Sequence, residues 1–177
     1  MKIRSARKGD VDAVASVHVK SWQSTYKDII ATDYLANLSI DCHAKQWREL
    51  LRRQNTKNCI FVAENKDEQI IGFASGGPQR DPQMNYDGEL YAIYLLQIAQ
   101  RRGLGTRLTY AVANYLAING FENMLVWVLE DNPSRLFYEA LGGKYVSKKM
   151  ITIGEQELIE VAYGWRNLPE LSKFNAQ

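Results

Sequence analysis

A short stretch with two glycines, residues 100–106, is the feature of this chain that most restricts its fold. The run before it, residues 89–96, is almost wholly apolar and aromatic, which predicts a β-strand. The run after it, residues 104–119, repeats its apolar residues on one face of a helix. A strand, a glycine turn and a helix in this order predict an α/β unit whose turn brings bare backbone close to a ligand.

The chemistry of this stretch predicts an anion site. Its members are Gln100, Arg101, Arg102, Gly103, Leu104, Gly105 and Thr106. The first turn of a helix carries a partial positive charge of roughly half an elementary charge, so neighbouring arginines are favourable there only when an anion is bound. A pyrophosphate fits. A dinucleotide fingerprint would need a third glycine where this chain has Leu108, and a P-loop would need Lys-Ser/Thr where it has Thr106-Arg107.

The stretch resembles the Gln/Arg-x-x-Gly-x-Gly/Ala signature of the GCN5-related N-acetyltransferases, which holds the pyrophosphate of coenzyme A. The order of expected elements, β-α-α-β-β-β-α-β-α-β-β, is similar to that family over residues 2–165. The resemblance implies an α/β (α+β) fold, a mixed and mostly antiparallel twisted sheet of about seven strands flanked by about four helices. In the family the fourth and fifth strands splay apart, and the acetyl thioester lies in the gap.

The remaining pattern predicts where these elements lie. Strands are expected at residues 2–5, 58–64, 69–76, 89–96, 124–129, 144–153 and 157–165, the last two as a hairpin across Gly154. Helices are expected after the N-caps Asp10, Asp41 and Asn132, besides the one at 104–119. Residues 24–39 read as irregular and residues 77–88 as a long polar loop. We expect a single domain over residues 2–167 and a C-terminal tail over 168–177.

Acetyl transfer to an amine needs a base for the ammonium and an acid for the leaving thiolate. The segment 132–142 resembles the family's Asn-x-x-Ala-x-x-x-Tyr helix, which implies that Tyr138 is the acid; the aromatic that follows this helix in the family is replaced by Gly143. Glu89 matches the place of a catalytic glutamate in several family members; a surface glutamate at a strand end is the alternative interpretation. Glu130 and Asp131 are weaker alternatives for the base.

The resemblance also implies two binding sets. The cofactor-binding set is Ile93, Tyr94, Leu95, Gln100, Arg101, Arg102, Gly103, Leu104, Gly105, Thr106, Asn132 and Tyr138, with Asn132 either touching the pantetheine arm or serving only as a helix cap. The substrate-binding set is Trp22, Tyr26 and Tyr86, where aromatic rings suit an amine by cation–π contact, together with the loop at 77–88. Hydrophobic packing is the plainer interpretation for Trp22.

Composition excludes several other classes of protein. A net charge of +2 gives no reason to expect nucleic-acid binding, and no run of 18 apolar residues predicts a membrane span. The first eight residues lack the apolar core of a secretory signal. Cys42 and Cys59 have no metal-ligand spacing, so no metal is expected. We expect a cytoplasmic protein, with a homodimer possible by analogy with relatives.

These observations predict an acetyl-CoA-dependent N-acetyltransferase. It would move an acetyl group to a primary amine of a small molecule or peptide in a direct ternary complex, because no cysteine lies in a motif for an acyl-enzyme step. Two alternatives stay open: a non-catalytic CoA-binding sensor module and, with less support, a nucleotide-dependent oxidoreductase.

Overall fold

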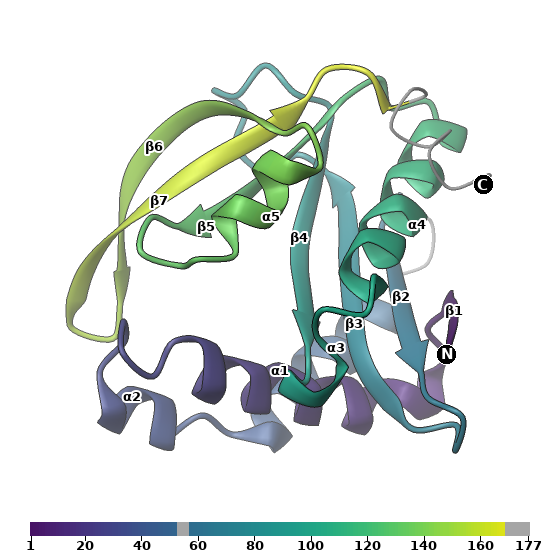
Figure 1. Cartoon of the computed structure of the whole chain (residues 1–177), viewed down its shortest axis with the longest axis vertical. Helices are drawn as coiled ribbons and strands as arrows, with labels where there is room; N and C mark the ends of the chain where they lie inside the picture. Colours follow the sequence, from purple (N-terminus) through teal and green to yellow (C-terminus); the bar gives the residue numbers. More distant parts are fainter. Residues whose placement is uncertain (53–56, 169–177) are drawn as a thin grey trace.

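The computed structural model describes residues 1–52 and 57–168, which form one open, mostly antiparallel sheet of seven strands (Figure 1). The strand order across the sheet is β1-β2-β3-β4-β5-β7-β6. The strands are β1 (Lys2–Ser5), β2 (Cys59–Glu64), β3 (Ile70–Pro78), β4 (Gly88–Leu95), β5 (Met124–Leu129), β6 (Lys144–Ile153) and β7 (Gln156–Trp165). The expected fold class is confirmed, and each predicted strand forms within two residues of its predicted bounds.

Five α-helices and two short 3-10 helices accompany the sheet in the described part of the chain. They are α1 (Val11–Thr25), α2 (Thr32–Ala36), α3 (Ile40–Arg52), α4 (Leu104–Ile118) and α5 (Arg135–Ala140), with η1 (Lys8–Asp10) and η2 (Gln97–Ala99). The prediction missed α2, whose five residues carry too little periodicity to be recognised. It is held by tertiary contacts instead, since Leu35 packs in a small cluster with Tyr26, Ile30 and Leu129.

Of the three predicted helix caps, Asp10 occupies the cap position, whereas Asp41 and Asn132 do not. Asp10 is the N-cap residue of α1 but its side chain makes no capping hydrogen bond; its carboxylate accepts one from the Arg4 guanidinium at 2.6 Å instead. Helix α3 begins one residue before Asp41, and Ser39 Oγ accepts from Cys42 N–H. Asn132 lies two residues before the cap position of α5. The Asp10 carboxylate thus binds Arg4, and Asn132 Oδ1 accepts from Ser134 N–H, in place of the expected capping bonds.

Two apolar layers cover opposite faces of the β1–β4 half of the sheet. On one face, Val62 and Phe73 pack with α1 and α3 around Trp47. On the other face, Ala63 and Ala74 pack with α4 and α5. Helices packed on both faces hold the β1–β4 half of the sheet, and the start of α4 lies near the end of β4.

The sheet splits between β4 and β5. These strands pair in parallel over three residues only, Gly88 to Leu90 against Met124 to Val126. Beyond that point they diverge, as Figure 1 shows, while β5 stays paired with β7 along its whole length. The splayed strands expected from the family resemblance are therefore confirmed.

A β-bulge lies at the point of divergence. In the β3–β4 ladder, Ser75 pairs with Ala92 and Gly76 with Leu90, so Tyr91 is the extra residue. A bulge bends its strand and increases the local twist. It therefore turns the second half of β4 away from β5 immediately after their last pair.

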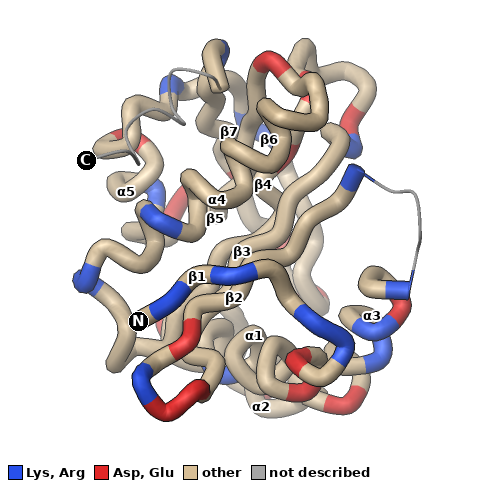
Figure 2. The backbone as a smooth tube through the Cα atoms, turned by 90° about the vertical axis from the view of Figure 1, so that its right-hand side faces the viewer, with Lys and Arg blue, Asp and Glu red and all other residues tan. Residues whose placement is uncertain are grey.

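Charged residues are mixed over the molecular surface. On the side shown in Figure 2, lysines and arginines lie singly and in short runs among acidic residues.

No helix of the described residues is long and apolar enough to cross a bilayer. Of the expected tail, Leu168 is fully buried and its N–H donates to Glu122 O at 2.9 Å, whereas 169–177 lie outside the described residues.

Candidate active site

The turn that enters α4 presents unpaired backbone amides. Gly103 has a left-handed φ of 74° and Arg101 a φ of 59°, which wind the chain into the helix. The first amide that the helix itself satisfies is that of Arg107, which donates to Gly103 O at 3.1 Å. The amides of Leu104, Gly105 and Thr106 precede it and point out of the helix end. This turn has the donors and the dipole that a phosphate group needs.

A cavity of about 490 Å³ runs from this turn into the gap between β4 and β5. Ten of the twelve predicted cofactor residues line it: Ile93, Tyr94, Leu95, Gln100, Arg101, Gly103, Gly105, Thr106, Asn132 and Tyr138. The other two do not. Leu104 is buried in the core, and the Arg102 side chain is exposed away from the cavity lining. We call this space the cofactor cavity.

Tyr138 reaches the cofactor cavity from α5. Its ring is 5% exposed and packs edge-on to Phe137, with Tyr163 and Trp165 at 6.4 Å behind it. Burial raises the pKa of its phenol well above the usual value, so the hydroxyl keeps its proton at neutral pH. The structure shows no hydrogen bond from this hydroxyl to another described residue, which leaves it available to a ligand.

Asn132 is held by the chain itself. Its Oδ1 accepts from Ser134 N–H at 2.9 Å, and its Nδ2 donates to Tyr26 Oη at 3.4 Å. The buried amide therefore fixes the turn before α5 and joins it to the end of α1. Its side chain lines the cofactor cavity but has both ends already engaged.

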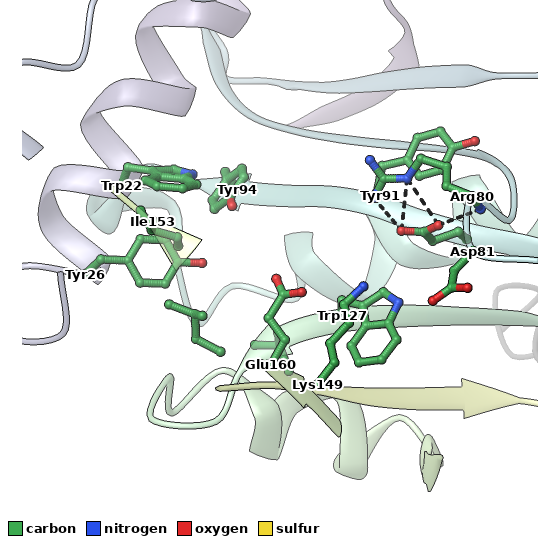
Figure 3. Close-up of a pocket in the computed structure, with 13 residues that line it drawn as sticks. Trp22, Tyr26, Arg80, Asp81, Tyr91, Tyr94, Trp127, Lys149, Ile153 and Glu160 are labelled. Carbon is green, nitrogen blue, oxygen red and sulfur yellow. Dashed lines mark hydrogen bonds and ion pairs between the residues drawn. The ribbon is translucent and has the colours of Figure 1, made fainter. Parts of the chain in front are cut away.

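A second cavity, of about 430 Å³, opens on the other side of the gap (Figure 3). Helix α1, the loop before β4, and the strands β4, β5, β6 and β7 supply its walls. Its lining includes Trp22, Tyr26, Arg80, Asp81, Glu89, Tyr91, Tyr94, Trp127, Lys149 and Glu160. Five residues line both cavities: Tyr26, Tyr91, Tyr94, Trp127 and Val128. The two cavities thus meet where the sheet splits, and we call the second one the acceptor cavity.

Glu89, the predicted base, lies in the wall of the acceptor cavity and is 2% exposed. Its carboxylate forms an ion pair with Arg80, whose backbone N–H also donates to it at 3.1 Å and whose Nε donates at 3.2 Å. Arg80 in turn stacks over the Tyr91 ring at 4.5 Å. The carboxylate is therefore a buried, fully bonded anchor for the loop that the sequence predicted as polar.

Glu160 is the carboxylate that the sequence analysis missed. It lies half-buried on β7 and lines the acceptor cavity. Burial raises the pKa of its carboxyl above the usual value. Alternation along the final strand offered a weak signal, because Glu160 falls on the same face as the apolar Leu158. The alternatives Glu130 and Asp131 line neither cavity.

Two of the three predicted substrate residues line the acceptor cavity, and the third does not. Trp22 and Tyr26 line the acceptor cavity, with their rings 5.0 Å apart. Tyr86 does not: it is buried against Gly164, under the guanidinium of Arg166 at 4.2 Å. Within the described residues, no group of three or more His, Cys, Asp or Glu side chains could hold a metal ion.

Comparison with known proteins gives consistent matches. The family model of FR47-like proteins matches residues 83–151, which span β4, α4, β5 and α5. The chain is 41% identical over 169 residues to YuaI of Bacillus subtilis (strain 168), an uncharacterized N-acetyltransferase, covering 96% of this chain and 95% of that one.

Solved structures share the fold. The PaiA N-acetyltransferase of Thermoplasma acidophilum, in complex with coenzyme A, matches with a TM-score of 0.69 at 22% identity, over 90% of this chain and 96% of that one. The ribosomal-protein-alanine N-acetyltransferase of Brucella melitensis matches with a TM-score of 0.73 at 18% identity, over 94% and 99%. With the split sheet and the glycine turn, these matches show that the chain is an N-acetyltransferase of the GCN5-related N-acetyltransferase family.

Proposed function

We propose that this protein transfers the acetyl group of acetyl-CoA to a primary amine in a direct ternary complex. One observation carries the proposal: two cavities on opposite sides of the sheet meet at the gap between β4 and β5. A donor on one side and an acceptor on the other would face each other across this gap. Holding two reactants in this way removes much of the entropic barrier of a bimolecular step.

The cofactor cavity fits coenzyme A. The unpaired amides at the start of α4 suit its pyrophosphate, and Arg101 supplies a cation beside them. A side chain at Gly105 would lie 3.2 Å from the Phe137 ring, so glycine keeps this part of the wall open. The structurally similar PaiA protein holds coenzyme A. Acetyl-CoA would supply the acetyl thioester.

The second half of β4 offers backbone groups to that thioester. From Tyr91 onward β4 has no partner on the β5 side, so residues 93–95 face the cofactor cavity with free main-chain positions on that edge. We propose that an N–H of this edge polarises the acetyl carbonyl. The side chains of Ile93 and Leu95 pack into the core meanwhile.

Tyr138 is the proposed general acid. It holds a proton on a buried phenol in the cofactor cavity and can give it to the leaving sulfur. Neither cysteine lines either cavity: Cys42 is exposed, and burial raises the pKa of Cys59 to about 12. No thiolate is therefore placed to take the acetyl group first, which supports direct transfer.

A carboxylate of the acceptor cavity is proposed to take the proton of the incoming ammonium. The sequence predicts Glu89 for this role, and Glu89 lines that cavity. To act as the base it would have to accept the proton while bound to Arg80. Glu160, in the opposite wall, is the second candidate, and the structure gives its carboxylate no such partner.

Calorimetry and a thiol-release assay test the proposed function together. Acetyl-CoA should bind with measurable heat, and a panel of primary amines should contain at least one that releases free thiol in stoichiometry with amide. Tight binding without turnover of any amine would support the sensor module instead. NADH binding in place of acetyl-CoA would support the oxidoreductase.

A further inference from the structure

Five charged side chains line the acceptor cavity, and two of them are paired with each other. Arg80 and Glu89 form an ion pair at one end. Lys149 lies over the ring of Trp127 at 3.9 Å, which satisfies its ammonium by cation–π attraction. Asp81, beside Arg80, completes the charged lining apart from Glu160. Three acidic and two basic side chains give the cavity lining a net charge of −1, so it lacks one positive charge for neutrality.

Among the carboxylates of this cavity, Glu160 is the one to which the structure gives no hydrogen-bonded partner among the described residues, since Glu89 binds Arg80 and Asp81 accepts from Gln83 N–H. The structure shows neither a hydrogen bond nor an ion pair from its carboxylate to another described residue, although Lys149 faces it across the β6–β7 ladder. Its side chain points from β7 into the cavity, toward the side where Tyr26 and Tyr94 lie (Figure 3). Removing a carboxylate from water without giving it a partner costs free energy, and a bound cation would offset this cost.

The aromatic rings around Glu160 also favour a cationic ligand. Trp22 lies on α1, Tyr26 directly follows that helix, Tyr94 lies on β4 and Trp127 on β5. Aromatic faces attract an ammonium group and also bury the apolar carbons attached to it. Because three of these residues, Tyr26, Tyr94 and Trp127, also line the cofactor cavity, a cation held here would lie at the gap where the sheet splits.

We propose that Glu160 binds the ammonium of the acceptor and takes its proton, and that the acceptor is a primary monoamine with an apolar, ring-like body. This inference rests on the proposed function. A single ammonium would neutralise the cavity, whereas a second ammonium would have to displace or oppose Lys149. An acceptor carboxylate would be repelled by Asp81, Glu89 and Glu160.

The proton balance is simple. One proton moves from the ammonium to Glu160, and the neutral amine nitrogen bonds to the acetyl carbon. The carbon–sulfur bond breaks, and the sulfur receives the proton of Tyr138. The nitrogen gives up one further proton, which restores Tyr138 through solvent, and Glu160 releases its proton to solvent, so the products are the amide, the free thiol and one proton. Burial favours this use of Glu160, because it raises the pKa of the carboxyl and so strengthens the carboxylate as a base. The Glu160 carboxyl is acted on by three charged neighbours, namely Lys149, Arg80 and Glu89.

The test compares Glu160→Gln with the wild type, using 2-phenylethylamine as the probe in a thiol-release assay over a range of pH. We expect kcat/KM to fall about 100-fold and the acid limb of the pH profile to disappear, since a general base contributes roughly 100-fold or more. Acetyl-CoA affinity, measured by calorimetry, should stay unchanged. Glu157→Gln is the matched control: this glutamate lies on the same strand, exposed on the opposite face, and should leave the profile as in the wild type.

Two further arms separate the ways in which the inference can fail. Glu89→Gln should keep the acid limb; loss of that limb in Glu89→Gln and its retention in Glu160→Gln would overturn the role of Glu160. Spermidine and L-phenylalanine should be poorer acceptors by at least tenfold, and faster turnover of either would overturn the substrate class. Absence of heat with acetyl-CoA in the wild type would instead overturn the proposed function itself.

Discussion

At the scale of single residues, the proposed acid Tyr138 owes its state to its surroundings. Its ring is enclosed by Phe137, Tyr163 and Trp165, and this enclosure keeps the phenol protonated. We expect Tyr138→Phe to lower kcat by about 100-fold, because the thiolate would leave without its proton donor. Acetyl-CoA affinity should change little, since the ring remains. Single-turnover kinetics with calorimetry would check both, and an unchanged kcat would make Tyr138 purely structural.

His18 illustrates a residue whose effect is on stability. Its ring stacks on Tyr94 at 4.9 Å and lies 4.6 Å from the His43 ring, and its Nδ1 is buried without a hydrogen bond. Burial, with a smaller effect from His43, lowers its pKa to about 3. A histidine whose folded pKa lies below its unfolded value of about 6.5 favours the folded state above pH 6.5, and this contribution is lost as the pH falls from 6.5 toward 3.

The corresponding variant is His18→Phe, which keeps a ring in the aromatic cluster. Between pH 7 and pH 4.5 we expect the wild type to lose about 1–2 kcal/mol more stability than the variant does. Urea denaturation at several pH values measures this difference. Asp10 and Glu64, whose pKa values are lowered by Arg4, destabilise both proteins equally in acid and cancel in the comparison. Parallel pH curves would show that the pKa of His18 is the same in the folded and unfolded states.

At the scale of elements, the bulge between β3 and β4 decides where the sheet opens. Gly76 faces this bulge, and an added Cβ would lie 2.8 Å from Glu89 O and 2.5 Å from Val112 Cγ1. We expect Gly76→Ala to lower the free energy of unfolding by about 1–3 kcal/mol, because either the strand pair or α4 must move to make room for the added methyl group. Gly9→Ala is the control, since nothing lies within 4 Å of its added Cβ. Equal denaturation midpoints for the two variants would contradict this interpretation of the bulge.

At the scale of the whole molecule, two half-sheets are joined through only three paired residues of β4 and β5. A ligand in the cofactor cavity would contact β4, α4 and α5 and so link both halves. Acetyl-CoA at 100 times its Kd should raise the free energy of unfolding by about 2.7 kcal/mol. For a chain of this size, that increase raises Tm by roughly 5–11 °C. Differential scanning calorimetry checks the shift, with NADH as the control ligand. A shift with NADH alone would contradict acetyl-CoA use.

Local sequence patterns were enough for most of the elements and for the cofactor cavity. Alternation and helical periodicity gave all seven strands and four of the helices, because burial imposes those periods on the chain. The glycine turn and its resemblance to the family gave most of the cofactor cavity, because these residues are adjacent in sequence. Helix α2 was not recognised, and Tyr86 was expected in the substrate site instead of against Gly164, because both depend on partners that are distant in sequence.

What the sequence determined by itself was the order of strands and helices and the glycine turn at the start of α4 that is predicted to bind an anion, since periodicity and backbone freedom are local properties. Only the tertiary structure decided which carboxylate is free. Glu89 is bonded to Arg80 across the loop, and Glu160 is brought by β7 to the wall of a cavity whose other residues come from α1, β4 and β5. Pairing between charges depends on which distant segments the fold places side by side, and no local pattern contains that information.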